Sequence, residues 1–122
     1  MKLSYLDKLY SEFIRKRAIK RVQGCERCFN GKSSWKDLQT SHFYGRSRRS
    51  VRFDETNATG LCGACHMFLS SHPQEHYEWF RNYIGEAEFM FLEGRMRQIG
   101  KVDEKLLAIY YQEKIRELDD GT

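Results

Sequence analysis

Apolar residues recur at helical spacing along residues 4–23, which predicts an amphipathic helix at the start of the chain. Ser4, followed three positions later by Asp7, has the pattern of a capping box, and Gly24 is placed to end the helix. The polar face is basic towards its end, where the cations are Arg15, Lys16, Arg17, Lys20 and Arg21. These charges fit either ordinary solvation or contact with phosphates, and the pattern leaves both open.

The second half of the chain shows three more helical patterns. One begins at Pro73, which suits the first turn of a helix, and Gly85 is placed to end it. The others cover residues 86–99 and 103–118, and residues 119–122 are expected to fray. Their apolar and aromatic stripes are typical of a core, and they could also dock a protein partner or a second copy through the C-terminal helices.

Between these helices the pattern changes to short alternating runs bounded by turn formers. Residues 38–44 and 51–53 are predicted to pair as a β-hairpin, with His42 near the end of its first arm. Residues 29–35 and 54–60 are rich in turn-forming residues and are predicted to be loops. The chain therefore combines helices with a small sheet.

All four cysteines of the protein fall in two Cys-x-x-Cys pairs. They are Cys25, Cys28, Cys62 and Cys65. Two such pairs supply the four thiolates that a tetrahedral Zn²⁺ ion requires. In a reducing compartment this spacing favours a structural zinc site over disulfides, and iron bound as in rubredoxin is a chemical alternative. The second pair is expected to open a short helix that Ser70 and Ser71 interrupt.

The 122 residues allow one small domain with a modest core, which a structural metal would stabilise. Lys and Arg number 21 against 17 Asp and Glu, and the net charge of +4 favours an anionic partner such as DNA. No run of about 20 apolar residues is present. Asp7 and Lys8 lie where a signal peptide would be hydrophobic, so we expect a cytoplasmic protein without a membrane span.

A second basic cluster lies between the two cysteine pairs. It comprises Arg46, Arg48, Arg49 and Arg52. Because it flanks the segment around His42, we expect these arginines to contact the phosphate backbone of DNA, although a solvated loop would show the same composition.

Three polar residues near the cysteines could together hydrolyse a phosphodiester. Two strands closed by a helix can present a histidine that activates water, a divalent ion, and an amide that holds the histidine in position. His42 is the candidate general base and Asn57 the orienting amide. His66 is the candidate ligand of the catalytic ion, at the start of the closing helix.

In these residues the chain resembles the His-Asn-His (HNH) endonucleases. Asn57 follows His42 by 15 residues and His66 follows Asn57 by 9, and a Cys-x-x-Cys pair directly before the last histidine is common in that superfamily. The resemblance implies an α+β fold with a zinc-stapled ββα-metal core, similar to a treble clef, flanked by an N-terminal helix and C-terminal helices. It also implies a structural Zn²⁺ at the four cysteines and a separate catalytic Mg²⁺ or Mn²⁺.

Residues 25–83 are most similar to the phage recombination proteins of the NinG (Rap) group. The shared pattern is Ser-His-Phe around His42, then Val-Arg-Phe-Asp-Glu-Thr-Asn ending at Asn57, then the second cysteine pair. This resemblance implies an endonuclease that acts on branched or recombination intermediates of phage DNA, in the cytoplasm of the host cell.

One position departs from the pattern of many HNH nucleases. They carry Asp or His as a metal ligand directly before the base, and here Ser41, a weak candidate ligand, occupies that position. With His66 as the main protein ligand, His72 or His76 could supplement the site, although a solvent-facing pair is the simpler interpretation of those two.

The motifs divide the chain into three parts. These are a basic amphipathic helix at 1–24, a zinc-bound ββα core at 25–84 and a helical extension at 85–122. Two hypotheses stand beside the endonuclease. One is a non-catalytic, zinc-dependent nucleic-acid-binding module on an HNH scaffold, and the other is a protein-interaction module with an architectural zinc.

Overall fold

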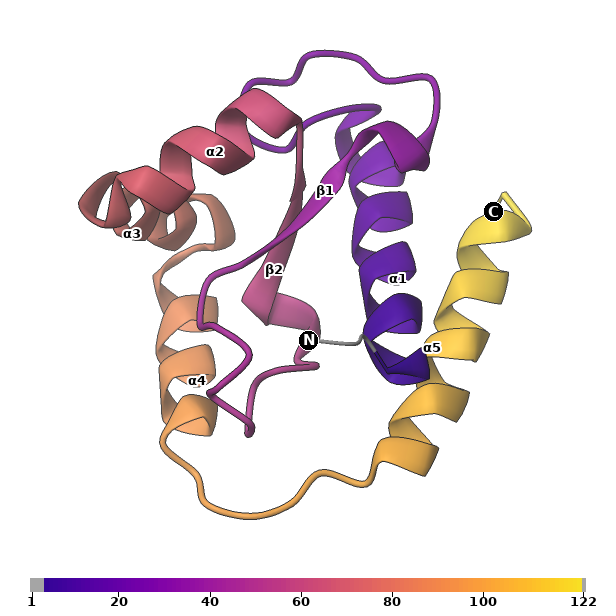
Figure 1. The fold of residues 1–122 in the computed structure, drawn as a ribbon, viewed down its shortest axis with the longest axis vertical. Coiled ribbons are helices and arrows are strands. Elements are labelled where there is room, and N and C mark those ends of the chain that lie inside the picture. The colour runs from indigo at the N-terminus through magenta and orange to yellow at the C-terminus, as the bar shows by residue number, and fades with distance from the viewer. Residues whose placement is uncertain (1–3, 122) are drawn as a thin grey trace.

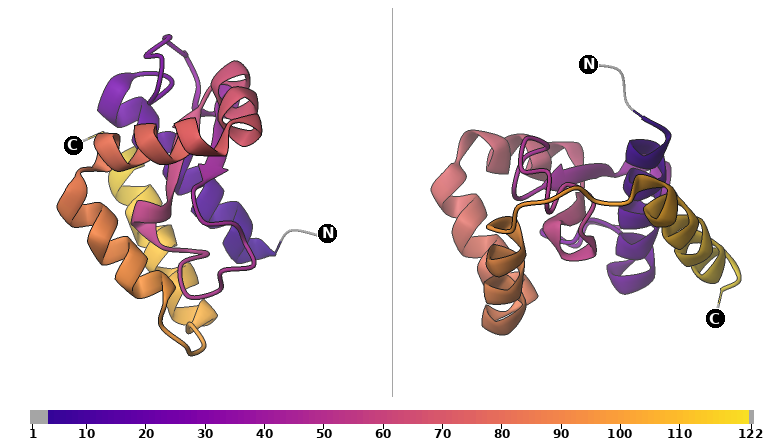
Figure 2. Two further views of the ribbon diagram at one scale, coloured as in Figure 1. Left: turned by 90° about the vertical axis from the view of Figure 1, so that its left-hand side faces the viewer. Right: turned by 90° about the horizontal axis from the view of Figure 1, so that it is seen from below.

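The computed structural model describes residues 4–121. Within them lie five α-helices and one antiparallel sheet of two strands, so the chain is of the α+β class (Figure 1). The elements are α1 (Tyr5–Val22), η1 (Trp35–Asp37), β1 (Gln39–His42), η2 (Glu55–Asn57), β2 (Ala58–Leu61), α2 (Gly63–Ser71), α3 (Pro73–Ile84), α4 (Glu86–Met96) and α5 (Glu104–Asp119), where η marks a 3-10 turn. The sheet lies in the middle, with α3 and α4 on one side and α1 and then α5 on the other (Figure 2).

Helix α1 starts as its sequence predicts. The Ser4 hydroxyl accepts a hydrogen bond from the backbone N–H of Asp7, and the Asp7 carboxylate accepts one from the backbone N–H of Ser4, which completes the capping box. The helix is capped by Gln23, whose φ of 56° is left-handed, so Gly24 does not end it. Gly24 is needed because a Cβ there would overlap the backbone carbonyl of Asn30.

The predicted second strand is wrong. Residues 51–53 form turns, whereas residues 58–61, of which 58–60 were expected in a loop, form β2 and pair antiparallel with β1. Strand β1 is also shorter than the predicted 38–44. The order β1, β2, α2 is therefore strand, strand, helix, as expected for a ββα unit, with a different segment as its second strand.

Packing explains why residues 51–53 are not a strand and why residues 58–61 are. Val51 and Phe53 are buried, but their side chains enter different hydrophobic clusters, which requires the chain to turn between them. Strand β2 is buried along its whole length against α1. A Cβ on Gly60 would lie 2.7 Å from the Cβ of Ala18, so the glycine that suggested a loop is what lets the strand approach the helix.

Helix α2 continues through Ser70 and Ser71, which were expected to interrupt it. Their hydroxyls donate to backbone carbonyls one turn earlier, so they add hydrogen bonds without breaking the helix. Helix α3 begins at Pro73 as predicted, and Gly85, with a φ of 93°, separates it from α4. Helix α4 ends at Met96, short of the predicted residue 99.

Helix α5 is capped by Asp103, whose carboxylate accepts a hydrogen bond from the backbone N–H of Leu106. It extends to Asp119, which was expected to be frayed and instead forms an ion pair with Lys16 of α1 at 2.6 Å. The last residue, Thr122, lies outside the described part of the chain.

Three groups of buried apolar side chains hold these elements together. The first joins α1 to α5 and includes Tyr10, Phe13, Phe53, Tyr111 and Ile115. The second surrounds the cysteines and includes Ala18, Leu38, Leu61 and Leu69. The third joins α3 and α4 and includes Val51, Phe80, Phe89 and Leu92. The division at residues 24/25 and 84/85 stays a prediction.

The two C-terminal helices leave apolar side chains in solvent, among them Met90 and Phe91 on α4 and Leu106 and Ile109 on α5. A protein partner or self-association through these helices stays a prediction. No helix in residues 4–121 is long and apolar enough to cross a membrane.

Candidate functional site

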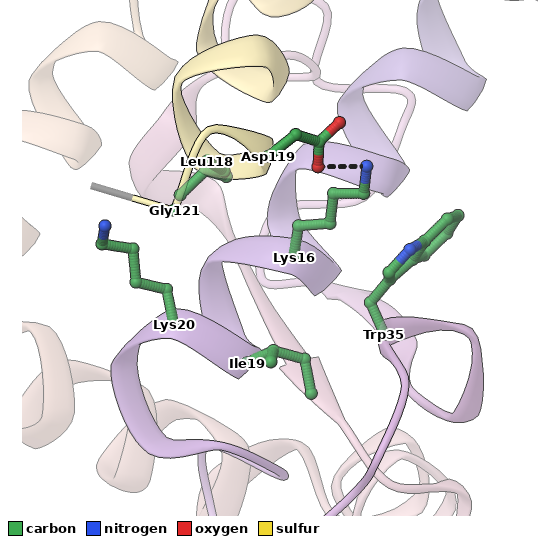
Figure 3. A pocket seen from close by; sticks show the side chains of 7 residues that line it. All are labelled: Lys16, Ile19, Lys20, Trp35, Leu118, Asp119 and Gly121. Atoms are coloured by element: carbon green, nitrogen blue, oxygen red, sulfur yellow. Dashed lines mark hydrogen bonds and ion pairs between the residues drawn. The ribbon is translucent and has the colours of Figure 1, made fainter.

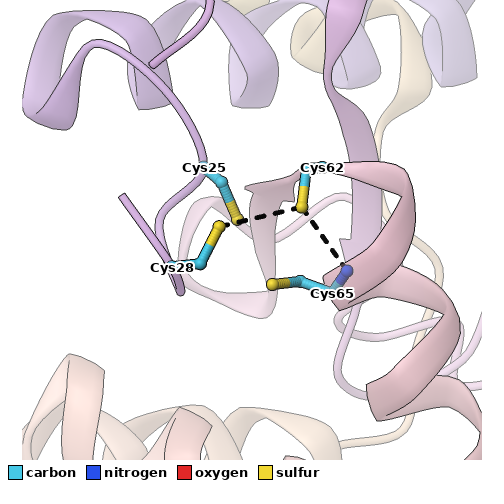
Figure 4. Close-up of side chains that lie close together, drawn as sticks. All are labelled: Cys25, Cys28, Cys62 and Cys65. Carbon is cyan, nitrogen blue, oxygen red and sulfur yellow. Dashed lines mark hydrogen bonds between the residues drawn. The ribbon is translucent and has the colours of Figure 1, made fainter. Parts of the chain in front are cut away.

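The four cysteine thiols converge from two distant parts of the chain (Figure 4). All four sulfur atoms lie within 4.8 Å of one another, and the Sγ atoms of Cys28 and Cys62 are 3.8 Å apart. A tetrahedron with Zn–S bonds of about 2.3 Å has edges of about 3.8 Å. None of the four cysteines forms a disulfide. They could therefore hold a metal such as zinc.

Local backbone structure positions both pairs. In the first pair, the backbone N–H of Cys25 donates to the carbonyl of Asn30 at 3.2 Å, which folds the chain into a tight knuckle. In the second pair, Cys62 is the N-cap of α2, and its sulfur accepts a hydrogen bond from the backbone N–H of Cys65 at 3.5 Å. Although burial raises the pKa of Cys62, this bond and those from neighbouring thiols lower it to about 7.

Glu26 ties the first knuckle to the rest of the fold. Its side chain is fully buried, and its carboxylate accepts hydrogen bonds from the backbone N–H of Gly60 at 2.7 Å and from the Tyr83 hydroxyl at 2.8 Å. The guanidinium of Arg21 also forms an ion pair with the Glu26 carboxylate at 3.3 Å. Sequence reasoning missed this residue because its hydrogen-bond partners Gly60 on β2 and Tyr83 on α3 lie 34 and 57 residues away.

His42 lies at the end of β1 with its ring 5.5 Å from that of Tyr10. The imidazole is half-buried, and no group in residues 4–121 forms a hydrogen bond with it. Burial, followed by the nearby charge of Arg46, lowers the pKa of His42 to about 4. The ring is therefore neutral at neutral pH and has a lone pair that can accept a proton from water.

His66 lies in the first turn of α2 and contacts β1 through Gln39. Its Nδ1 is 2.7 Å from the Oε1 of Gln39. Because that amide oxygen can only accept, Nδ1 carries the proton, and in the neutral ring Nε2 carries the lone pair. No sequence pattern pointed to Gln39, whose amide sets the tautomer of His66 as a hydrogen-bond partner does for many metal-binding histidines.

Asn57 acts on the backbone next to His42 rather than on its ring. The side chain is fully buried; its Oδ1 accepts from the backbone N–H of Tyr44 at 2.8 Å, and its Nδ2 donates to the Tyr44 carbonyl at 2.9 Å. The Asn57 carbonyl also accepts from the backbone N–H of Phe43 at 2.8 Å. These three bonds fix the chain that leaves β1.

The remaining candidate ligands are scattered. Ser41 is only 3% exposed, and alternation along β1 directs it away from the face of His42. The ring of His72 stacks on Phe68, and His76 packs edge-on against Phe43, so they do not form a solvent-facing pair. In the described part of the chain, the four cysteines are the one group of three or more His, Cys, Asp or Glu side chains that lie close enough together to share a metal ion.

The four arginines between the cysteine pairs differ in their surroundings. Arg46, Arg48 and Arg49 are exposed in the turn that follows β1. Arg52 is half-buried and its guanidinium binds the carboxylate of Asp7. The first three are therefore open to an anionic ligand, whereas Arg52 is engaged within the protein.

A comparison with protein-family models, curated proteins and solved structures finds no match to this chain. The function must therefore be argued from the site.

Proposed function

We propose that this protein is a metal-dependent DNA endonuclease of the HNH type. The observation that supports it best is the arrangement of two histidines on the ββα unit. His42, neutral and partly open to solvent, ends β1, and His66, with its Nε2 lone pair available, begins α2. Gln39 of β1 links the two elements through its contact with the His66 ring. Branched or recombination intermediates of phage DNA are the substrates that the resemblance suggests.

In this proposal His42 removes a proton from a water molecule, whose oxygen forms a new bond to the scissile phosphorus while the bond to the leaving oxygen breaks. Asn57 keeps His42 in place by holding the backbone of Tyr44. A divalent ion at His66 would stabilise the charge on the phosphate and the leaving oxygen. Since an imidazole nitrogen suits Mn²⁺ better than Mg²⁺, we expect Mn²⁺ to support the faster reaction.

Cleavage of supercoiled and four-way-junction DNA tests this proposal. Wild type with Mn²⁺ or Mg²⁺ should cut, and His42→Ala should lose cleavage while keeping zinc and DNA binding. His72→Ala is the matched control, because this exposed histidine lies outside the proposed centre and should leave cleavage unchanged. If zinc-loaded wild type leaves both DNAs intact with either ion, the endonuclease proposal fails.

The second candidate is a non-catalytic, zinc-dependent nucleic-acid-binding module. Burial of Ser41 favours it, since it leaves His66 as the main side chain available to hold a catalytic ion. This hypothesis predicts DNA affinity that falls with salt and survives His42→Ala, without cleavage by the wild type.

A further inference from the structure

The cations on the basic face of α1 differ in whether they pair with a carboxylate or a backbone carbonyl elsewhere in the chain. Arg17 donates to backbone carbonyls, and Arg21 and Lys16 bind carboxylates of the chain itself. Arg15 forms no ion pair within residues 4–121 and instead lies over the indole of Trp35, with its guanidinium carbon 4.6 Å from the ring centroid. Among the described residues, no carboxylate pairs directly with Arg15, and the one acidic side chain whose charge acts on it is Glu12, which forms its ion pair with Lys16.

Three cationic side chains lie near the ring of Trp35. Besides Arg15, the amines of Lys16 and Lys36 lie 5.4 and 5.8 Å from the centroid. Lys16 forms an ion pair with Asp119 at 2.6 Å, which offsets its charge, and both residues line a hollow of about 450 Å³ (Figure 3). Lys36 is exposed in η1 and forms no ion pair among the described residues. Arg15 and Lys36 thus make a small positive patch.

Stacking prepares Arg15 to bind an anion. A guanidinium held over an indole is restrained by the ring, so it loses less side-chain freedom on binding an anion than a solvated lysine does. The Arg15 Nε also donates to the carbonyl of Ser11 at 3.2 Å, which further restricts the side chain. A planar fork held in this way suits a phosphate.

This patch is connected to the candidate catalytic histidine by direct contacts. The Ser11 hydroxyl lies 2.7 Å from that of Thr40 in β1, and Thr40 is on the same face of the strand as His42. Arg15 lies one helical turn from Ser11 and His42 lies two residues along β1 from Thr40, so the patch and the histidine flank the same contact between α1 and β1.

We propose that Arg15 and Lys36, gathered at Trp35, form a second phosphate-contact site for the DNA substrate. This inference rests on the proposed function, since it uses His42 to locate the scissile phosphate. The site contacts backbone phosphates, so it strengthens binding without selecting a sequence.

Binding of a fluorescent duplex to Arg15→Ala/Lys36→Ala tests this site over a range of salt concentrations. We expect the dissociation constant to rise about tenfold and the slope of log affinity against log salt to become shallower by about 1.8, which is about 0.9 for each of two phosphates. Lys105→Ala/Lys114→Ala is the matched control, because it removes the same charge from α5, and it should keep the wild-type slope.

Two further measurements distinguish the loss of a phosphate contact from misfolding of the variant and from an absence of nuclease activity. Lys36→Glu alone changes an exposed position, so it should keep zinc and helicity while weakening binding. Saturating DNA should restore cleavage by the Arg15/Lys36 variant, whereas it should not rescue His42→Ala. If the affinity and salt slope of the Arg15/Lys36 variant match those of the α5 control, the proposal of a second phosphate-contact site is wrong, even if the wild type cuts DNA.

Discussion

The guanidinium of Arg52 binds the carboxylate of Asp7 through hydrogen bonds of 3.2, 3.0 and 2.8 Å, across 45 residues of sequence. Asp7 is only 5% exposed and also accepts the capping hydrogen bond of α1 from Ser4. Although burial raises the pKa of Asp7, the hydrogen bonds from Ser4 and Arg52 lower it overall. The pair joins the start of α1 to the turn at residues 51–53, and both charges act on the neighbouring His42.

Arg52→Ala should therefore destabilise the protein by about 3 kcal/mol, because it leaves a buried carboxylate without its partner. Urea denaturation followed by circular dichroism measures the change. Arg48→Ala, at an exposed position in the same segment, should stay within about 0.5 kcal/mol of wild type. Equal losses in the two variants would show that the Arg52–Asp7 contact adds no stability.

Asn57→Ala should lower both stability and cleavage. It removes two hydrogen bonds to the backbone of Tyr44 and leaves a buried N–H and C=O unpaired, which costs about 2 to 4 kcal/mol. The turnover number, measured well below the melting temperature, should fall while DNA affinity changes little. Asn82→Ala, on the exposed surface of α3, is the control and should behave as wild type. An unchanged turnover number in Asn57→Ala would exclude the positioning role.

Removal of zinc should unfold the protein. Structural zinc supplies about 10 kcal/mol or more of binding free energy, which is comparable with the whole stability of a small domain, about 5 to 15 kcal/mol. Three of the four cysteines lie in a hydrophobic cluster that depends on the site. A chelator should abolish the cooperative thermal transition, and added zinc should restore it. Cys28→Ser should weaken zinc binding, whereas Ser33→Ala, on the neighbouring exposed loop, should not.

Two glycine substitutions should change stability in opposite directions. Gly24→Ala places a Cβ on the backbone carbonyl of Asn30, so the first knuckle must shift and stability should fall by about 2 to 3 kcal/mol. Gly94→Ala meets no atom within 4 Å on α4 and should stabilise the protein by about 1 kcal/mol through helix propensity. Melting temperatures of the two variants measure the contrast, and a neutral Gly24→Ala would contradict the close approach.

Acid should destabilise the folded protein partly through His42. Its pKa is about 4 when folded, through burial and the charge of Arg46, against about 6.5 for a free histidine, so the unfolded chain binds this proton more readily between those values. Stability should fall as pH decreases through this window, by at most about 1.4 kcal/mol per pH unit from this group. Denaturation of zinc-saturated wild type and His42→Gln at about pH 7 and about pH 5 isolates the contribution. If His42→Gln loses as much stability between the two pH values as the wild type does, the pH dependence arises from other titrating groups.

Several features that depend on neighbours in the sequence were predicted correctly, although Gly24 does not end α1 and Ser70 does not interrupt α2. The capping box at Ser4, the proline start of α3 and the Asp103 cap of α5 each involve residues at most a few positions apart, so their hydrogen bonds follow from local geometry. The spacing within the cysteine pairs is local too, and it correctly indicated that the four thiols come together.

Features that depend on packing were decided only by the tertiary structure. The pattern at 51–53 alternates as a strand does, yet its apolar side chains enter two separate clusters, and β2 forms instead because Gly60 fits against α1. The partners of Glu26, Arg52 and His66 lie 34, 45 and 27 residues away, and no local pattern encodes them. The sequence by itself therefore determined which residue types could hold a metal and where helices begin. The tertiary structure decided which charges stabilise the fold and which remain open to a ligand, because burial and pairing depend on contacts between distant segments.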